Sequence, residues 1–313
     1  MSHPSKNGGY FINSSNDGHS SSGGFWEPHT ASIDFCESNY LMTDLVVEPH
    51  NVWSSLVAFT LLGVVGIAHG NPTREWRTFL IYTILLVIGL GSACLHATLH
   101  WCFQSFDELP MIFLVICSFY AVLEVDSPKG ERKYPHLAKY LILLSCASTA
   151  IYYSFRQLYA VFLATFTSMT VVILCLHVKI AQRLYNEVKR DNKNKQFDAD
   201  EIETKKIALR FYALHHIAYT LIASPIWVID QFHCGYLLSI YNNLPYPLTG
   251  MTLHVAWHVC AGIGAHFFVQ FLCACRAGAL GMVCDTRRVL GILPVVIVND
   301  TPTNKMSATR KQA

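Results

Sequence analysis

The chain alternates between long apolar stretches and short polar connections. Its apolar stretches are about 18 to 25 residues long, close to the length with which an α-helix crosses the hydrocarbon core of a bilayer. Few charged residues interrupt them. The pattern predicts an all-α membrane protein, a bundle of seven transmembrane helices over residues 52–69, 78–98, 108–126, 137–155, 158–180, 207–230 and 250–273.

An odd number of spans places the two ends of the chain on opposite sides of the membrane. Of the 23 Lys and Arg residues, only Lys6 and Arg156 fall on the side of the N-terminus. Because cytoplasmic loops are enriched in Lys and Arg, we expect a lumenal or extracellular N-terminus and a cytosolic C-terminus.

The connections divide the chain into four parts. Residues 1–25 are rich in Gly and Ser and lack the apolar core of a signal peptide, so we expect them to be disordered. Residues 26–51 form a lumenal segment, residues 52–275 a transmembrane catalytic domain, and residues 276–313 a cytosolic tail. The apolar run in that tail is too short to span a membrane, and we expect it to pack on the bundle or lie at the interface.

Composition supports a membrane protein and excludes several other classes. Hydrophobic residues make up 52% of the 313 residues and charged residues only 14%, against about 25% charged in soluble domains. A net charge of +2 gives no basis for nucleic-acid binding. The 11 cysteines include no C-x-x-C pair, which excludes a thioredoxin-like site and a zinc ribbon.

Three histidines lie inside the predicted spans at one depth of the membrane. His96 ends the second span, and His254 and His258 begin the seventh, one helical turn apart. An ionisable residue in a span is costly and so points to function. His100 and His266 have compatible spacings too, so spacing alone leaves open which three bind a metal. We interpret His215 and His216 as hydrogen-bonding residues.

Three His ligands leave a fourth tetrahedral position for water, which is typical of a hydrolytic zinc site. If the chain turns near residues 100–104, Asp107 returns to the depth of His96 and would act as base and proton donor. Ser92 lies one turn before His96 and would hold an oxyanion by a hydrogen bond.

Several longer motifs resemble the alkaline ceramidase family. They are ASIDFCESNYLMTDLVVEPHNVWSSL, GSACLHATLHWCFQSFDELPMI, SPIWVIDQFHC and LHVAWHVCAGIGAH, in the family's order and spacing over residues 25–295. The resemblance implies a seven-helix amidohydrolase that cleaves ceramide, a membrane lipid, to sphingosine and a fatty acid. It also implies zinc ligands His96, His254 and His258, with Ser92 and Asp107 completing the catalytic site around His96, and it argues against His100.

The resemblance further implies a calcium site in the lumenal segment. Its oxygen ligands suit Ca²⁺, with Phe35 contributing its backbone carbonyl where the family usually has Trp. The implied ligands are Asp34, Phe35, Glu37, Asn39 and Glu48. The family also bridges Cys36 and Cys234, which both fall on the predicted lumenal side.

These expectations together describe a ceramidase of the endoplasmic reticulum or Golgi membrane with Zn²⁺ and Ca²⁺ and no obligate protein partner. A lumenal N-terminus would expose the sequon at Asn13 to glycosylation. Two alternatives remain open. One is a related hydrolase or lipid-remodelling protein acting on another lipid, and the other is a seven-span receptor similar to the progestin and adipoQ group.

Overall fold

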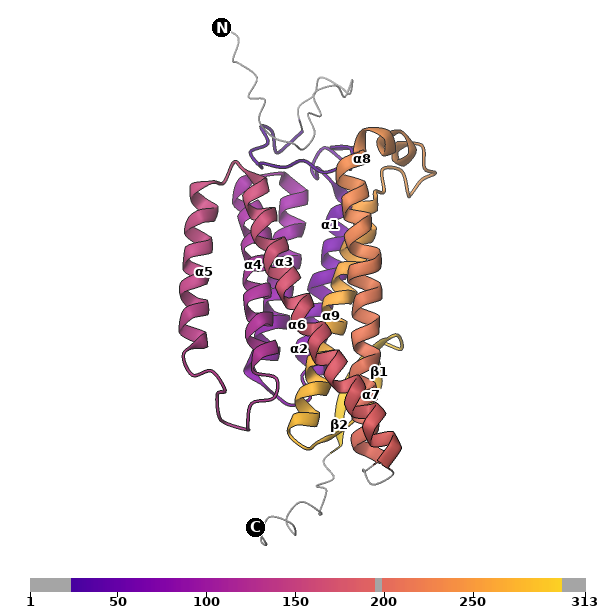
Figure 1. Cartoon of the computed structure of the whole chain (residues 1–313). Coiled ribbons are helices and arrows are strands. Elements are labelled where there is room, and N and C mark those ends of the chain that lie inside the picture. Colours follow the sequence, from indigo (N-terminus) through magenta and orange to yellow (C-terminus); the bar gives the residue numbers. More distant parts are fainter. Residues whose placement is uncertain (1–23, 195–198, 300–313) are drawn as a thin grey trace.

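A bundle of long helices, roughly parallel to one another, makes up most of the molecule (Figure 1). The computed structural model describes residues 24–194 and 199–299. The segment that precedes the first helix covers one end of the bundle, and a short β-hairpin lies towards the other. The predicted glycosylation site Asn13 lies outside the described residues.

Eleven helical elements and two strands follow one another in the described parts of the chain. The first apolar stretch is one continuous helix, and so is the stretch that leads into α8. The elements are α1 (Pro49–Ser55), the π-helical turn η1 (Leu56–Thr60), α2 (Leu61–His69), α3 (Trp76–Thr98), α4 (Trp101–Leu123), α5 (Leu137–Ser154), α6 (Tyr159–Asn194), α7 (Ala199–His215), the π-helical η2 (His216–Ala223), α8 (Ser224–Asn242), α9 (Leu253–Ala279), β1 (Val283–Val289) and β2 (Leu293–Asn299).

The described helices confirm a multi-span helical membrane protein. Six segments are long and apolar enough to cross a bilayer, judged by length and composition: Pro49–His69, Trp76–Thr98, Trp101–Leu123, Tyr159–Asn192, Ala199–Asn242 and Leu253–Ala279. The expected fourth span corresponds to α5, which stands beside α4 in Figure 1 but is not among the six. Lys139 and several Ser and Thr residues dilute its apolar sequence. The count of seven spans therefore stays a prediction.

The connection between α3 and α4 is shorter than the sequence suggested. Leu99 adopts a left-handed conformation (φ 48°, ψ 38°) that ends α3, and α4 begins at Trp101 instead of near residue 108. The expected turn over residues 100–104 is thus replaced by Leu99 and His100. As a result Asp107 lies in the second turn of α4 and returns towards α3.

Close packing of these two helices depends on Gly91. A Cβ atom there would lie 2.2 Å from the Phe106 carbonyl oxygen and 2.9 Å from the Asp107 backbone nitrogen. Only glycine permits this approach without displacing the backbone of α4. The contact brings Ser92, which follows Gly91, and Asp107, which follows Phe106, to the same part of the bundle.

The C-terminal tail packs on the bundle as an antiparallel hairpin, in which Val283 pairs with Asn299. The Val296 backbone N–H donates to Gln270 Oε1 at 2.6 Å, and His266 Nε2 donates to the Pro294 carbonyl oxygen at 2.9 Å. Of the two expected placements for this apolar run, the structure therefore shows packing on the helices.

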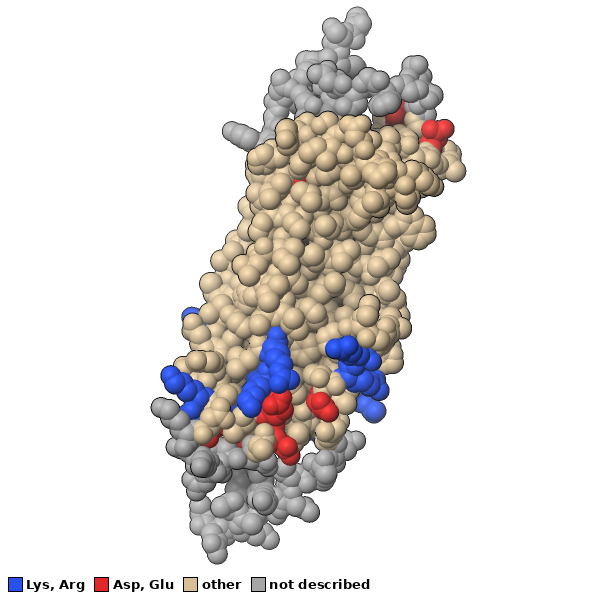
Figure 2. Space-filling model, turned by 90° about the vertical axis from the view of Figure 1, so that its right-hand side faces the viewer, with Lys and Arg blue, Asp and Glu red and all other residues tan. Residues whose placement is uncertain are grey.

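Charge is unevenly distributed along the bundle. Figure 2 shows Lys and Arg gathered towards the end that carries the hairpin, below a wide uncharged band. This distribution is consistent with the predicted cytosolic C-terminus.

Candidate metal centre

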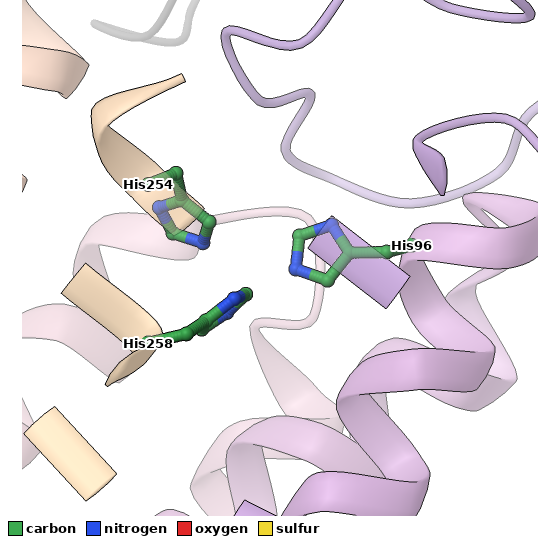
Figure 3. A group of neighbouring side chains, drawn as sticks. All are labelled: His96, His254 and His258. Atoms are coloured by element: carbon green, nitrogen blue, oxygen red, sulfur yellow. The ribbon is translucent and has the colours of Figure 1, made fainter. Parts of the chain in front are cut away.

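Three buried histidines meet near the end of the bundle that the N-terminal segment covers. His96 comes from the last turn of α3, and His254 and His258 come from the first two turns of α9. The ring centroids are separated by 5.4 Å (His96–His254), 5.2 Å (His96–His258) and 4.5 Å (His254–His258). One nitrogen of each ring lies within 4.8 Å of the others. Figure 3 shows the three rings facing a common space.

Two hydrogen bonds orient these rings. His96 Nδ1 donates to Glu48 Oε2 at 2.5 Å. Ser54 Oγ donates to the Asn51 carbonyl oxygen at 3.1 Å and so accepts from His258 Nδ1 at 2.7 Å. In both rings Nδ1 is therefore occupied, and Nε2 is left to bind a ligand.

The donor set suits a zinc ion. His96 Nε2 and His254 Nδ1 are buried and have no hydrogen-bond partner among the described residues. Neutral imidazole nitrogens are common zinc ligands, and a carboxylate behind a ligating histidine fixes its tautomer and raises its basicity. Three histidines would leave one coordination position open for water or substrate.

The remaining candidate histidines serve other contacts. His100 Nε2 donates to the Trp26 carbonyl oxygen at 2.9 Å. His266 lies between the Tyr82 hydroxyl and the hairpin, and His215 Nδ1 donates to the Gly264 carbonyl oxygen at 2.9 Å. Within residues 24–194 and 199–299, only His96, His254 and His258 form a group with metal-binding spacing.

Ser92 and Asp107 lie beside this centre. Ser92 Oγ is buried and 2.9 Å from Ser55 Oγ, which itself donates to the Asn51 carbonyl oxygen at 2.8 Å. Ser92 therefore donates to Ser55, and rotation about its C–O bond would aim the same hydrogen at a ligand oxygen. Both Ser92 and Asp107 line a cavity of about 120 Å³.

Two cavities share walls next to the histidines. The first, between α3, α4, α6 and α9, extends deep into the bundle past side chains such as Leu85, Phe166 and Phe268. The second, of about 250 Å³, is lined by His254, His258 and residues of α6 and α8. Asp107 and Trp257 line both. Two mainly apolar chambers that meet beside polar groups suit a ligand with two alkyl chains.

The N-terminal segment covers the metal centre and places its acidic residues close together. The Phe35 ring lies 4.5 Å from the His96 ring and 4.6 Å from the His254 ring, centroid to centroid. Both Glu37 oxygens accept backbone N–H groups at the start of α1, from His50 and Asn51 at 2.8 Å. Asn39 Nδ2 donates to Asp34 Oδ2 at 3.5 Å.

The electrostatics of this segment suit a hard cation. Burial raises the pKa of Glu37 to about 8, against the effect of its two backbone hydrogen bonds. Burial, followed by the nearby charges of Asp34 and Glu37, raises the pKa of Glu48 well above its usual range. Asn39 Oδ1 is a buried oxygen with no hydrogen-bond partner in the described structure. A calcium ion would relieve the repulsion between these carboxylates and use such oxygens as ligands.

Cys36 and Cys234 form a disulfide that joins this segment to α8, with an S–S distance of 2.14 Å and a Cα–Cα distance of 5.4 Å. The bridge closes a sequence separation of 198 residues. It ties the covering segment to α8, the helix that precedes α9 and its two histidines.

Comparison with known proteins shows the family of the chain. A family model described as Ceramidase matches residues 27–289. The chain belongs to the ceramidase family. It is 29% identical to "Alkaline ceramidase 3" of Mus musculus over 278 residues, which are 88% of this chain and 94% of that protein. It is 26% identical to "Alkaline ceramidase" of Arabidopsis thaliana over 280 residues, 89% and 97% of the two chains. The Drosophila melanogaster "Alkaline ceramidase" is also 26% identical, over 77% of each chain. The resemblance inferred from the motifs is thus confirmed.

Sequence reasoning missed several contacts in this ceramidase-family site. Glu48 was expected only as a calcium ligand, yet it binds the His96 ring. No role was predicted for Ser54 or Ser55, although Ser54 contacts His258 and Ser55 contacts Ser92. These partners are 37 to 204 residues apart along the chain, so local spacing carries no signal of them. A pair of serines facing inward from the first span was the one available hint.

Proposed function

We propose that this chain is a zinc-dependent intramembrane amidohydrolase that cleaves the amide bond of ceramide to a sphingoid base and a fatty acid. The observation that carries the proposal is the His96, His254 and His258 group at the junction of two apolar cavities. A zinc ion bound there would act as a Lewis acid on the amide carbonyl and activate water. The choice of ceramide as substrate is supported by the chain's membership in the ceramidase family and by its similarity to proteins named alkaline ceramidase.

The protein's own groups would then handle binding and protons. Asp107, which faces both cavities, would accept a proton from the attacking water and return it to the leaving nitrogen. The Ser92 hydroxyl would turn from Ser55 to the amide oxygen and stabilise the negative charge that develops there. Each cavity would hold one alkyl chain, and the buried site would keep bulk water away from the reaction.

We also propose a calcium ion in the N-terminal segment, held by Asp34, the Phe35 backbone carbonyl, Glu37, Asn39 and Glu48. The ion would neutralise the acidic cluster and fix the Phe35 ring against His96 and His254. Its effect would thus be on stability and on the order of the cover, while the zinc site performs the chemistry.

The proposed setting is the endoplasmic reticulum or Golgi membrane, with seven spans, a lumenal N-terminus and no obligate protein partner. In this orientation the metal centre lies in the lumenal half of the bilayer. A ceramide molecule would reach it sideways from the lipid.

The deciding experiment measures free sphingoid base released from a panel of ceramides by the purified protein. Wild type should release it, and His254→Ala should lose both activity and zinc. His100→Ala is a matched control, because His100 contacts the Trp26 carbonyl oxygen and not the metal centre. Zinc-loaded wild type that hydrolyses no ceramide would contradict the proposal and favour the receptor alternative. Full activity and zinc content in His254→Ala would exclude this metal site.

A further inference from the structure

Glu108 is a buried acid that directly follows Asp107, the proposed proton carrier, and it has no part in the proposed proton transfer. Only 3% of its surface is exposed. It lines the cavity of about 250 Å³ whose wall includes His254 and His258. It also lines a smaller chamber of about 10 Å³ between α4, α5 and α6. The carboxyl group therefore stands in the wall between the two.

This smaller chamber is more polar than the deep cavity beside Ser92. Its lining includes Ser148, Tyr152 and Thr165, and it reaches the exposed Arg156 in the connection between α5 and α6. Tyr159 joins Glu108 in lining both spaces. A polar group of a ligand would therefore find partners on this side of the metal centre, whereas the deep cavity offers mainly apolar contacts.

The covering segment holds Glu108 in place through Gln104. Gln104 Nε2 donates to Glu108 Oε1 at 2.8 Å. The same amide is fixed by Ser32, whose backbone N–H donates to Gln104 Oε1 at 2.7 Å and whose hydroxyl accepts from Nε2 at 2.7 Å. Tyr152 also interacts with this carboxyl group. Because a carboxyl group has two oxygens and about four acceptor positions, Gln104 and Tyr152 together still leave acceptor capacity for a ligand.

The proposed substrate has donors at a matching distance from the reacting amide. In an N-acyl amino alcohol such as ceramide, the hydroxyl groups at C1 and C3 are each on a carbon bonded to the one that carries the amide nitrogen. Glu108 directly follows Asp107 on α4, about 100° further around the helix, and both line the cavity whose wall includes His254 and His258. If Asp107 serves the amide nitrogen, the adjacent carboxyl group is in position for a hydroxyl group a few bonds away.

We propose that Glu108 binds a hydroxyl group of the amino-alcohol half of the substrate and makes the enzyme select hydroxylated long-chain amides over plain N-alkyl amides. The inference rests on the proposed function and names a specificity residue for it. It also gives the N-terminal segment a part in selectivity, because Ser32 and Gln104 orient the carboxyl group.

The test crosses enzyme variants with matched substrates. Wild type and Glu108→Gln are assayed with ceramide and with analogues that lack the hydroxyl at C1 or at C3. Glu108→Gln keeps the size of the side chain and an oxygen for Gln104. A hydrogen bond of ordinary strength corresponds to roughly 2- to 10-fold in kcat/KM. We expect wild type to prefer ceramide over one analogue by about this factor, and Glu108→Gln to lose that preference.

A loss that is equal for all three substrates would overturn the inference, since it would mean a general defect in folding or chemistry. Glu203→Gln makes the same chemical change at a half-buried position on α7 that lines none of these cavities, and it should leave the preference unchanged. If wild type hydrolyses none of the substrates, the proposed function fails, and a binding measurement decides the inference separately. Wild type should then be stabilised more by a long-chain amino alcohol than by an alkyl amine of equal length, measured as a shift in Tm, and Glu108→Gln should not. If the amino alcohol and the alkyl amine raised the Tm of wild type equally, the proposed role of Glu108 would be refuted.

Discussion

Glu48 offers the sharpest test of how the metal centre is built. Its Oε2 accepts a hydrogen bond from His96 Nδ1 at 2.5 Å, and the two side chains are 0% and 1% exposed. Glu48→Gln preserves the shape of the side chain but removes its charge and one acceptor oxygen. With no solvent in reach of the pair, water cannot replace the lost acceptor. The His96 ring should become a poorer zinc ligand.

The size of the effect follows from the role of such carboxylates. Removing a hydrogen-bond partner of a metal-ligating histidine typically lowers metal affinity or activity about 10- to 100-fold, which corresponds to about 1.4 to 2.7 kcal/mol. We expect the upper part of this range, because both side chains are buried. Deleting His96 itself should have a larger effect, since it removes a ligand outright.

The assay is competition for zinc between the purified protein and a chelator of known affinity, followed by ceramide hydrolysis at saturating zinc. Glu37→Gln is the matched control, because its carboxylate accepts backbone N–H groups of α1 and not a histidine. The zinc affinity of Glu37→Gln should stay within about 2-fold of the wild-type value, because changes that share no partner with the metal ligands have nearly independent effects. The reasoning would be wrong if Glu48→Gln bound zinc as tightly as wild type and changed only the response to calcium.

Three further predictions address the calcium site, the orientation and the opposite end of the bundle. Calcium should raise the Tm of wild type in a concentration-dependent way. Glu37→Ala should lower the Tm and weaken the response to calcium while zinc stays bound. If the Tm of both proteins were equally insensitive to calcium concentration, the calcium site would be excluded. Mapping of glycans on protein from a eukaryotic host should find none on Asn299. A glycan on Asn299 would show that the true orientation is the reverse of the predicted one, whereas a glycan on Asn13 would support the prediction. Burial alone would raise the pKa of Glu75, but hydrogen bonds from Arg77 and Arg276 outweigh it and hold the pKa below its usual value of 4.5. Their ion pairs therefore stabilise the fold above that pH, and the stabilisation disappears as the pH falls through the folded-state pKa. Glu75→Gln should lower Tm at neutral pH, and its difference from wild type should shrink below about pH 4; a constant difference would contradict this account.

Apolar stretches and their charged flanks were enough to predict the helical, multi-span character of the chain, because a bilayer requires each crossing helix to be long and apolar. Helix ends were less certain. The left-handed Leu99 allows a two-residue turn, and α6 continues to Asn194 because its later, charged turns remain good helix formers outside the apolar region. The hairpin of the tail was not predicted, since its strands are stabilised by contacts with Gln270 and His266 on another element.

At the site, the sequence by itself determined which residues were candidates. The four-residue spacing of His254 and His258 lies within one helix, and the family motifs contain His96, Ser92 and Asp107, so local pattern and resemblance were sufficient to name them. Only the tertiary structure decided that α3 and α9 bring three rings within metal-binding distance, while His100 and His266 point to backbone carbonyls. It also decided that Glu48 supports His96 across the bundle. The physical reason is that helical periodicity specifies which side chains share a face of one helix, whereas contacts between helices depend on packing details such as the approach that Gly91 allows.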